Sequence, residues 1–382
     1  MTTLPNGLTV VSEAASSTST VTLSYPKAGS SNELLDEQGA ALANKCMAFM
    51  SGSGMSTRFI YRAIEDAGGV PIVNADRTKS TLGYTVSPDN ATKLVGLLAV
   101  NCDMEKWDIR DALEQAATEA EVANSSAQIV LTENLYAAAY GPQSPAGRPF
   151  FSTGVSVDAL KAFRERTYGL NGAVLSATGI PDHSAFCAEV GEVLSASHVG
   201  SADAAAPLSY IGGESRVAVP GSGYAHVALA FQSPGSSVLA NIVKCVFDVV
   251  GQPSGASGFT GDGFVGIYGG SASPGGIVDS MTSAIKTATS GDAIKRAKGL
   301  AKAEALFALD GGSTSLANVM TASVLETGTF SGPADVAKAY DAVTESQVKS
   351  ALTSVLKSNP SLAAVGDITS VPYHATVASL LK

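Results

Sequence analysis

The sequence has few charged side chains. Among its 382 residues, Lys, Arg, Asp and Glu make up 15%, well below the usual quarter for a soluble domain. So weakly charged a surface suits a subunit that is largely covered by partners. The net charge is −10, and no dense Lys/Arg patch is available to neutralise phosphates. The composition therefore argues against nucleic acid or an anionic membrane as the main partner.

Cysteine and histidine are also scarce, with four of each. The histidines show no paired spacing, and the cysteines show no C-x-x-C spacing. In a chain of this length, scattered cysteines favour a reducing compartment over a disulfide framework. No metal constellation and no cofactor site is therefore predicted from these residues. The cysteines are Cys46, Cys102, Cys187 and Cys245.

Long apolar runs are absent as well. The longest, around Leu94–Val100, falls short of the ~18 residues that a membrane helix needs. The first residues, MTTLPNGLTVVSEAAS, contain neither an apolar signal core nor an Arg-rich amphipathic presequence. We expect no membrane span. Either the numbering begins near a mature start, or import uses no cleaved peptide.

The most informative stretch is QGAALANKCMAF, residues 38–49. Apolar residues recur near helical spacing from Leu34 to Met50, which predicts a helix. Residues 42, 45 and 46 would then project into one small volume. In metallopeptidases with an inverted zinc motif, H-x-x-E-H uses this spacing to place two imidazoles on the metal and a glutamate base beside the bound water.

The surrounding residues resemble the family of mitochondrial processing peptidases and complex III core proteins, which share a pitrilysin-like fold. In that family a loop of the form GSR-x-E leads to G-x-A-H-F-L-E-H-M-x-F, and here Ala28–Glu33 leads to Gly39–Phe49. By this resemblance Leu42 replaces the first histidine, Lys45 the glutamate base and Cys46 the second histidine.

The resemblance implies a degenerate site with no catalytic residue and no metal, because a zinc hydrolase needs three protein ligands and an open position. The family's third ligand, a glutamate, would fall near Glu119 or Glu121. An alternative is that the helix is plain core, since a free cysteine packs as a small hydrophobe. Both interpretations make the helix structural.

Two segments of the second half repeat segments of the first. GGESRVAV parallels NGLTVV, and HVALAFQSPGSS (226–237) parallels TVTLSYPKAGSS (20–31), with Gly213 and His226 each 206 residues after Gly7 and Thr20. This predicts an N-terminal peptidase-like domain at 1–197, a small polar linker at 198–211 and a C-terminal peptidase-like domain at 212–382.

Each half reads as an α+β domain, a mostly antiparallel sheet with helices packed on one face. The family is built from two such halves. Helices are expected at 59–67, 89–102, 107–124, 157–166, 277–289, 292–309, 313–326, from 333, and at 345–357. Strands are expected within 4–11, at 20–25, on both sides of Asp76 and Arg77, at 173–177 and at 264–268.

The segment 251–276 is rich in glycine, and Gly261–Gly266 matches G-x-G-x-x-G. No strand precedes the match and no helix opens at its end, so a dinucleotide site is disfavoured. The alpha subunit of the processing peptidase has a long glycine-rich loop in this half. The segment here is shorter and lacks the uninterrupted glycine run.

The resemblance implies a non-catalytic core subunit of ubiquinol–cytochrome c reductase, most like core protein 2. The implied partners are a sibling like core protein 1 and the cytochrome b, cytochrome c1 and iron-sulfur subunits of complex III. The implied location is peripheral, on the matrix side of the mitochondrial inner membrane, where the subunit would serve assembly and stability.

Three other functions stay open. The first is the alpha subunit of the processing peptidase, a soluble presequence-binding partner that a long glycine loop would distinguish. A catalytic metallopeptidase is opposed by Leu42, Lys45 and Cys46. An unrelated metabolic enzyme is opposed by the lack of a convergent set of His, Asp, Glu, Ser or Cys.

Overall fold

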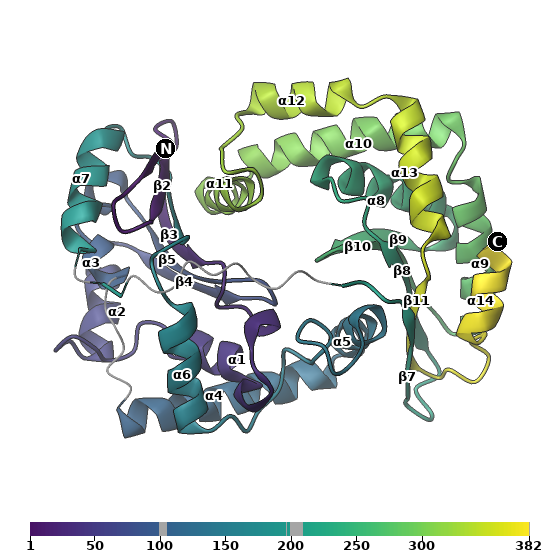
Figure 1. The fold of residues 1–382 in the computed structure, drawn as a ribbon, viewed down its shortest axis with the longest axis horizontal. Helices are drawn as coiled ribbons and strands as arrows, with labels where there is room; N and C mark the ends of the chain where they lie inside the picture. The colour runs from purple at the N-terminus through teal and green to yellow at the C-terminus, as the bar shows by residue number, and fades with distance from the viewer. Residues whose placement is uncertain (99–104, 196, 199–208, 382) are drawn as a thin grey trace. The chain divides into compact units, whose positions relative to one another are not determined.

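The computed structural model describes residues 1–98, 105–195, 197–198 and 209–381. These residues form two compact units. The first comprises Met1–Ala120, Phe150–Ala206 and Phe307–Gly332, and the second comprises Glu121–Pro149, Pro207–Leu306 and Pro333–Lys382. Each unit is built around one twisted sheet with its own helices (Figure 1).

The first unit contains a six-stranded sheet in the order β1-β2-β6-β3-β5-β4. Strands β2 and β6 are parallel, and the other neighbours are antiparallel. The strands are β1 (Thr2–Thr3), β2 (Thr9–Ser12), β3 (Ser19–Tyr25), β4 (Val70–Ala75), β5 (Ser80–Val86) and β6 (Val174–Ala177).

The second unit contains a five-stranded sheet in the order β7-β11-β8-β10-β9. Here β7 and β11 are parallel and the other neighbours antiparallel, so the sheet repeats β2-β6-β3-β5-β4 of the first unit in order and direction. The repeated topology confirms the α+β fold of two similar sheets. The strands are β7 (Gly213–Ala218), β8 (Ala225–Gln232), β9 (Ser257–Gly261), β10 (Phe264–Ser271) and β11 (Ser361–Gly366).

The helices surround these sheets. Those that begin in the first unit are α1 (Ala40–Cys46), α2 (Thr57–Asp66), α3 (Val95–Leu98), α4 (Lys106–Ser125), α6 (Val157–Thr167), α7 (His183–Val193) and α11 (Ser313–Thr327). Those that begin in the second unit are α5 (Ala127–Tyr140), α8 (Ser237–Gly251), α9 (Pro274–Thr287), α10 (Gly291–Asp310), α12 (Pro333–Ala342), α13 (Glu345–Lys357) and α14 (His374–Leu381). Within the described residues, no helix is long and apolar enough to cross a membrane.

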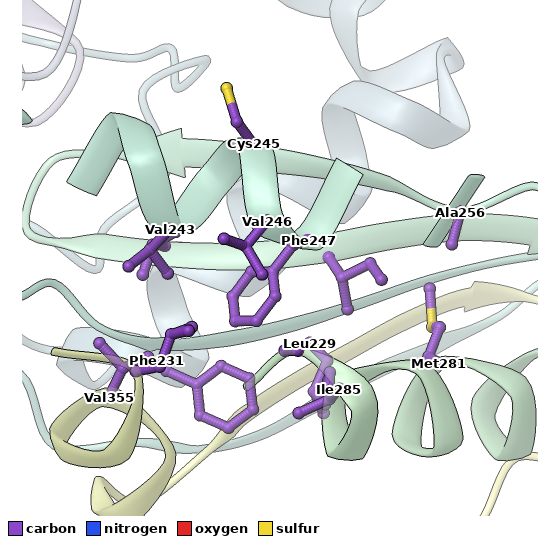
Figure 2. Packing of buried hydrophobic residues seen from close by; sticks show 14 of the residues in the cluster. Leu229, Phe231, Val243, Cys245, Val246, Phe247, Ala256, Met281, Ile285 and Val355 are labelled. Carbon is purple, nitrogen blue, oxygen red and sulfur yellow. The ribbon is translucent and has the colours of Figure 1, made fainter. Parts of the chain in front are cut away.

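Strand alternation gives the second sheet two packed faces. Successive residues of a strand point to opposite faces. Leu229 and Phe231 of β8 join the main core with residues of α8, α9 and α13. Figure 2 shows them with Phe247, Ile285 and Val355 of this cluster. Ala228 and Ala230 point the other way and join a cluster with α5. The small alanines let a helix lie close to the sheet.

Helices α5 and α11 are exchanged between the sequence halves. Helix α5 lies in the first half of the chain but packs on β11, β7 and β8 of the second unit. Helix α11 lies in the second half but packs on β6 and β3 of the first unit, where Met320 and Val324 cluster with Val11 and Val174. Each sheet thus receives a further helix on its second face. The boundaries 1–197 and 212–382 stay a prediction about the sequence repeat, and most of the linker, 199–208, lies outside the described residues.

The predicted helix at 38–49 is shorter than expected. Gly39, with φ of +92°, starts α1 and Phe49, with φ of +59°, lies in the left-handed region after its end. Leu34 and Leu35 lie before α1 and are 54% and 71% exposed. Their helical periodicity is therefore misleading, because they precede the glycine that starts the helix.

One other predicted helix needs correction, and one observed helix was not predicted. In the predicted helix 89–102, residues 88–90 form a 3-10 turn that Pro88 starts, α3 covers Val95–Leu98, and 99–102 lie outside the described residues. Helix α8 has no counterpart among the predicted helices, although it directly precedes the glycine-rich segment. In that segment the prediction that no strand precedes the G-x-G-x-x-G match is wrong, because β9 ends at Gly261. Asp262 and Gly263 form the turn of the β9–β10 hairpin, and β10 continues past Gly266 to Ser271, so no helix opens at the end of the match.

We expect the contact between α5 and the second sheet to be a main source of stability for that unit. Leu135 of α5 is buried within this contact, and Leu135→Ala should cost ~2–5 kcal/mol because it leaves a cavity. Urea unfolding measures the loss. Leu35→Ala, at a residue 71% exposed, is the matched control and should change stability by less than ~0.5 kcal/mol. Equal losses in the two variants would contradict the packing described here.

Candidate functional site

The predicted degenerate motif lies on α1, and a buried carboxylate anchors the start of that helix. The side chain of Glu33 accepts a hydrogen bond from the backbone N–H of Ala41 at 2.7 Å and another from Gly39 at 3.2 Å. Both donors belong to the first turn, where helical N–H groups lack partners. A Cβ on Gly39 would lie 2.7 Å from the carbonyl oxygen of Ser152. These contacts explain why a glutamate and a glycine precede the motif.

Residues 42, 45 and 46 lie as helical spacing predicts. Leu42 is fully buried in the cluster that joins α1, α4 and α6. Lys45 forms an ion pair with Glu119 of α4, and the Cys46 Sγ lies 3.9 Å from the other oxygen of the same carboxylate. The structure therefore brings together Lys45, Cys46 and Glu119, while Glu121 is exposed.

The electrostatics of this cluster keep the Cys46 thiol protonated. Burial raises its pKa to about 11, and the negative charge of Glu119 adds to the effect while Lys45 opposes it. Zinc binds the thiolate, and the aliphatic Leu42 offers no donor atom. By the family resemblance a glutamate near Glu119 would be a zinc ligand, and in this structure the Lys45 ammonium pairs with Glu119 instead. The arrangement neutralises the carboxylate from within the chain.

A second cluster of the same kind lies in the other unit. Within the described part of the chain, the one group of three potential metal-ligating side chains is Cys245 and Asp248 of α8 with Glu304 of α10, whose donor atoms lie within 4.8 Å of one another. Lys244 Nζ lies 3.1 Å from Asp248 and 3.0 Å from Glu304. The Cys245 Sγ lies 3.5 Å from Glu304 and points away from the phenylalanines of the core (Figure 2).

Lys244 offsets one of the two negative charges of this second cluster. Burial alone would lower the pKa of Lys244, but Glu304 and Asp248 outweigh it and raise the pKa. Burial also raises the pKa of Cys245 to about 12, with Glu304 adding to the shift. Asp248 additionally accepts the N–H of Gly258 at 2.7 Å, which ties strand β9 to α8. The cluster is a structural junction.

The first part of the chain is similar to a known peptidase family. Residues 9–154 match the profile of the insulinase family of peptidases, peptidase family M16. This part of the chain is therefore similar to an M16 peptidase domain. The match includes α1 and Glu119, so the Lys45–Glu119 ion pair lies inside the matched region.

Several curated relatives of this chain are subunits of two mitochondrial assemblies. The chain is 26% identical to mitochondrial-processing peptidase subunit alpha-2 of Dictyostelium discoideum, over 100% of the chain and 94% of the relative. It is 25% identical to human cytochrome b-c1 complex subunit 2, over 97% and 90%. A match to the potato processing peptidase alpha subunit, at 29%, covers 62% of the chain and 47% of the relative.

The fold also matches a solved structure. A chain of complex III2 from Candida albicans, determined with Inz-5 bound, superposes with a TM-score of 0.84 and 19% identity, covering 100% of this chain and 99% of that one. At this identity the likeness establishes the fold, which spans both sheets and the exchanged helices.

The second cluster is not among the sequence predictions, although one signal points to it. The dipeptide Lys-Cys occurs at Lys45-Cys46 and again at Lys244-Cys245, once on the helix after the central strand of each unit. The duplicated topology predicts that the second pair has a glutamate partner as the first does. Nothing in the sequence spacing singles out Glu304 as that partner.

His183 has a structural role at the start of α7. The preceding Asp182 caps the helix by accepting the N–H of Ala185 at 3.0 Å. His183 Nδ1 lies 2.8 Å from the Ser12 hydroxyl, and its Nε2 lies 3.4 Å from the Cys187 Sγ. The Ser12 contact joins α7 to β2, and the Cys187 contact lies within α7.

The Lys45–Glu119 pair can be tested by charge reversal. Lys45→Glu and Glu119→Lys each place like charges together and should each lower stability by about 1 kcal/mol, because these side chains are 22% and 32% exposed and partly screened. The double swap should recover most of the loss. Thermal unfolding measures both effects, and the same swap at Arg110 and Glu114, which are 70% and 73% exposed, is the control. Strictly additive losses at 45 and 119 would show that the pair does not interact.

Restoring the zinc motif should destabilise the protein. Leu42→His, Lys45→Glu and Cys46→His together bury an imidazole in an apolar cluster and remove the counter-ion of Glu119. Without metal, we expect a loss of ~1–3 kcal/mol, measured by denaturant unfolding, and at best weak zinc binding. A triple variant as stable as the parent without metal would contradict the packing described for this face of α1.

Proposed function

We propose that this chain is a non-catalytic core subunit of ubiquinol–cytochrome c reductase, of the core protein 2 kind. It serves assembly and stability and takes no part in electron transfer. The observation that carries the non-catalytic part of the proposal is the Lys45–Glu119 ion pair, since by the family resemblance it puts an internal ammonium where such a peptidase holds its metal. Such a site can pack and can neutralise charge, but it offers no activated water.

The low charge fraction fits a subunit of a large assembly. Only 15% of the residues are charged, and large apolar side chains such as Phe307, Tyr373 and Trp107 are exposed. Obligate interfaces bury ~2,000 Å² or more and resemble a core cut in half. We propose a sibling like core protein 1 and the cytochrome b, cytochrome c1 and iron-sulfur subunits as the partners.

The glycine-rich segment favours a core subunit over the alternative. Residues 257–271 form the compact β9–β10 hairpin, whose turn is only Asp262 and Gly263. The hydroxyl of Tyr140 donates to the carbonyl of Asp262, and that of Tyr136 lies 3.1 Å from its carboxylate. A segment fixed in this way lacks the long free loop of a presequence-handling subunit.

The second candidate is the alpha subunit of the mitochondrial processing peptidase. It is favoured by the 26% identity to the Dictyostelium alpha-2 subunit over the whole chain. In this function the chain would be a soluble partner that binds presequences. Both candidates share the degenerate zinc site, so they differ in their assemblies and not in that site.

The two candidates are separated by where the chain is found. If it is a core subunit, it lies on the matrix side of the inner membrane and needs mild detergent for release as an intact complex. In native gels of gently solubilised mitochondria, it should then migrate with haem-containing cytochromes at many times its own mass of 38.5 kDa. Mass spectrometry of the band identifies the partners.

The processing-peptidase candidate predicts the opposite result. The chain would be released by matrix lysis without detergent. It would be found in a haem-free complex of about two chains, joined by an obligate interface. Zinc analysis of the purified chain serves as a control for both candidates. About one tightly held zinc per chain would contradict both candidates, since the zinc would require ligands other than Leu42 and Lys45.

A further inference from the structure

A cavity of about 350 Å³ lies within the second unit, between the exchanged helix α5 and the hairpin β9–β10. The volume is in the range of small-molecule sites, which run from ~300 to 1,000 Å³. It is lined by Gln128, Leu131, Thr132, Leu135, Tyr136, Ala228, Ser257, Phe259, Thr260, Gly261, Phe264 and Tyr268.

The walls of this α5–hairpin cavity are apolar and partly aromatic. Leu131, Leu135 and Phe264 are buried, and Phe259 and Phe264 meet edge to face with centroids 6.1 Å apart. None of the lining residues that the structure describes carries a charged side chain. A charged ligand would lose its hydration here without gaining a counter-ion, which is costly.

One end of the cavity is polar. The Tyr268 hydroxyl lies 2.7 Å from His226 Nδ1, and the Gln128 side-chain amide donates to the same hydroxyl at 3.2 Å. An amide nitrogen carries two hydrogens. The second N–H of Gln128 can therefore be offered to a hydrogen-bond acceptor on a ligand.

The cavity walls are held in place from outside. Tyr136 and Tyr140 of α5 bind Asp262 at the hairpin turn, and Asp248 of α8 binds the backbone of Gly258 in β9. The tyrosine contacts hold α5 against the hairpin turn, and the Asp248 contact holds β9 against α8. The cavity is therefore formed before any ligand arrives, as is usual for small-molecule sites.

We propose that the α5–hairpin cavity binds an uncharged, flat aromatic small molecule that has a hydrogen-bond acceptor at one end. The aromatic body would lie between Leu131 and Leu135 on one side and Phe259 on the other. Its acceptor would take the second N–H of the Gln128 amide. The site is independent of the Lys45–Glu119 cluster and of the function proposed above.

The test uses the full chain and prodan, an uncharged naphthalene ketone whose emission shifts to the blue in apolar surroundings. We expect saturable binding of one molecule per chain. Thr132 is exposed at the mouth of the cavity, and Thr132→Trp should weaken binding by about tenfold or more, since an indole there occupies ligand volume. Gln128→Leu should weaken binding by about two- to tenfold, the effect of one hydrogen bond.

Thr118→Trp is the matched control. Thr118 is an exposed helical threonine whose hydroxyl donates to the carbonyl four residues earlier at 3.0 Å, as that of Thr132 does. It should bind prodan like the parent, and thermal unfolding verifies that all three variants fold. Unsaturable binding, or equal weakening by Thr118→Trp and Thr132→Trp, would overturn the site. Equal or tighter binding of the anionic anilinonaphthalene sulfonate at the same site would overturn its preference for uncharged ligands.

Discussion

Covering both faces of a sheet is the constraint on which this fold depends. In each unit the central strand sends alternate side chains to opposite faces, and both faces are removed from water. Val21 and Leu23 of β3 lie in the apolar core on one face, while Thr20 and Thr22, both fully buried, point to the other. The helices that follow each strand in sequence cover the first face only. Helices α11 and α5 cover the second, and each comes from the other half of the chain.

The two exchanged helices cover their sheets with different chemistry. On the second sheet, small alanines of β8 and β11 meet Leu135 and Tyr140 of α5 in an apolar cluster. On the first sheet, hydroxyl groups meet hydroxyl groups, as where Ser176 of β6 lies 2.7 Å from Thr321 of α11. Buried hydroxyls need partners. Helix α11 therefore presents hydroxyl groups to its sheet beside the apolar Met320 and Val324, where α5 presents leucine and tyrosine.

Local patterns predict much of the fold and of the candidate site, while contacts between distant residues account for the rest. Helix α10 lies within one residue of its predicted bounds, 292–309, because its apolar spacing and the glycines after it are local signals. The cluster of α1 with α4 follows from helical spacing and from the family resemblance. The leucines before α1 mislead, since the left-handed Gly39 outweighs their periodicity. The approach of Glu304 to Cys245, 59 positions apart, depends on how α10 packs on α8, which spacing does not encode. The exchange of α5 and α11 also depends on contacts between distant residues. Each of these helices packs on the sheet face that the other helices leave uncovered, and local spacing does not encode that face.

The exchange also governs the order in which the chain can fold as it is made. The first sheet is complete once β6 has been synthesised, at Ala177, but its second face stays uncovered until α11 ends at Thr327. While residues 178–327 are being made, this face remains exposed, and its hydroxyls can bind water until α11 is complete. Hydroxyl groups therefore suit a sheet face that is hydrated until its last helix has been made. The apolar face of the second sheet differs, because α5 is synthesised before the first strand of that sheet.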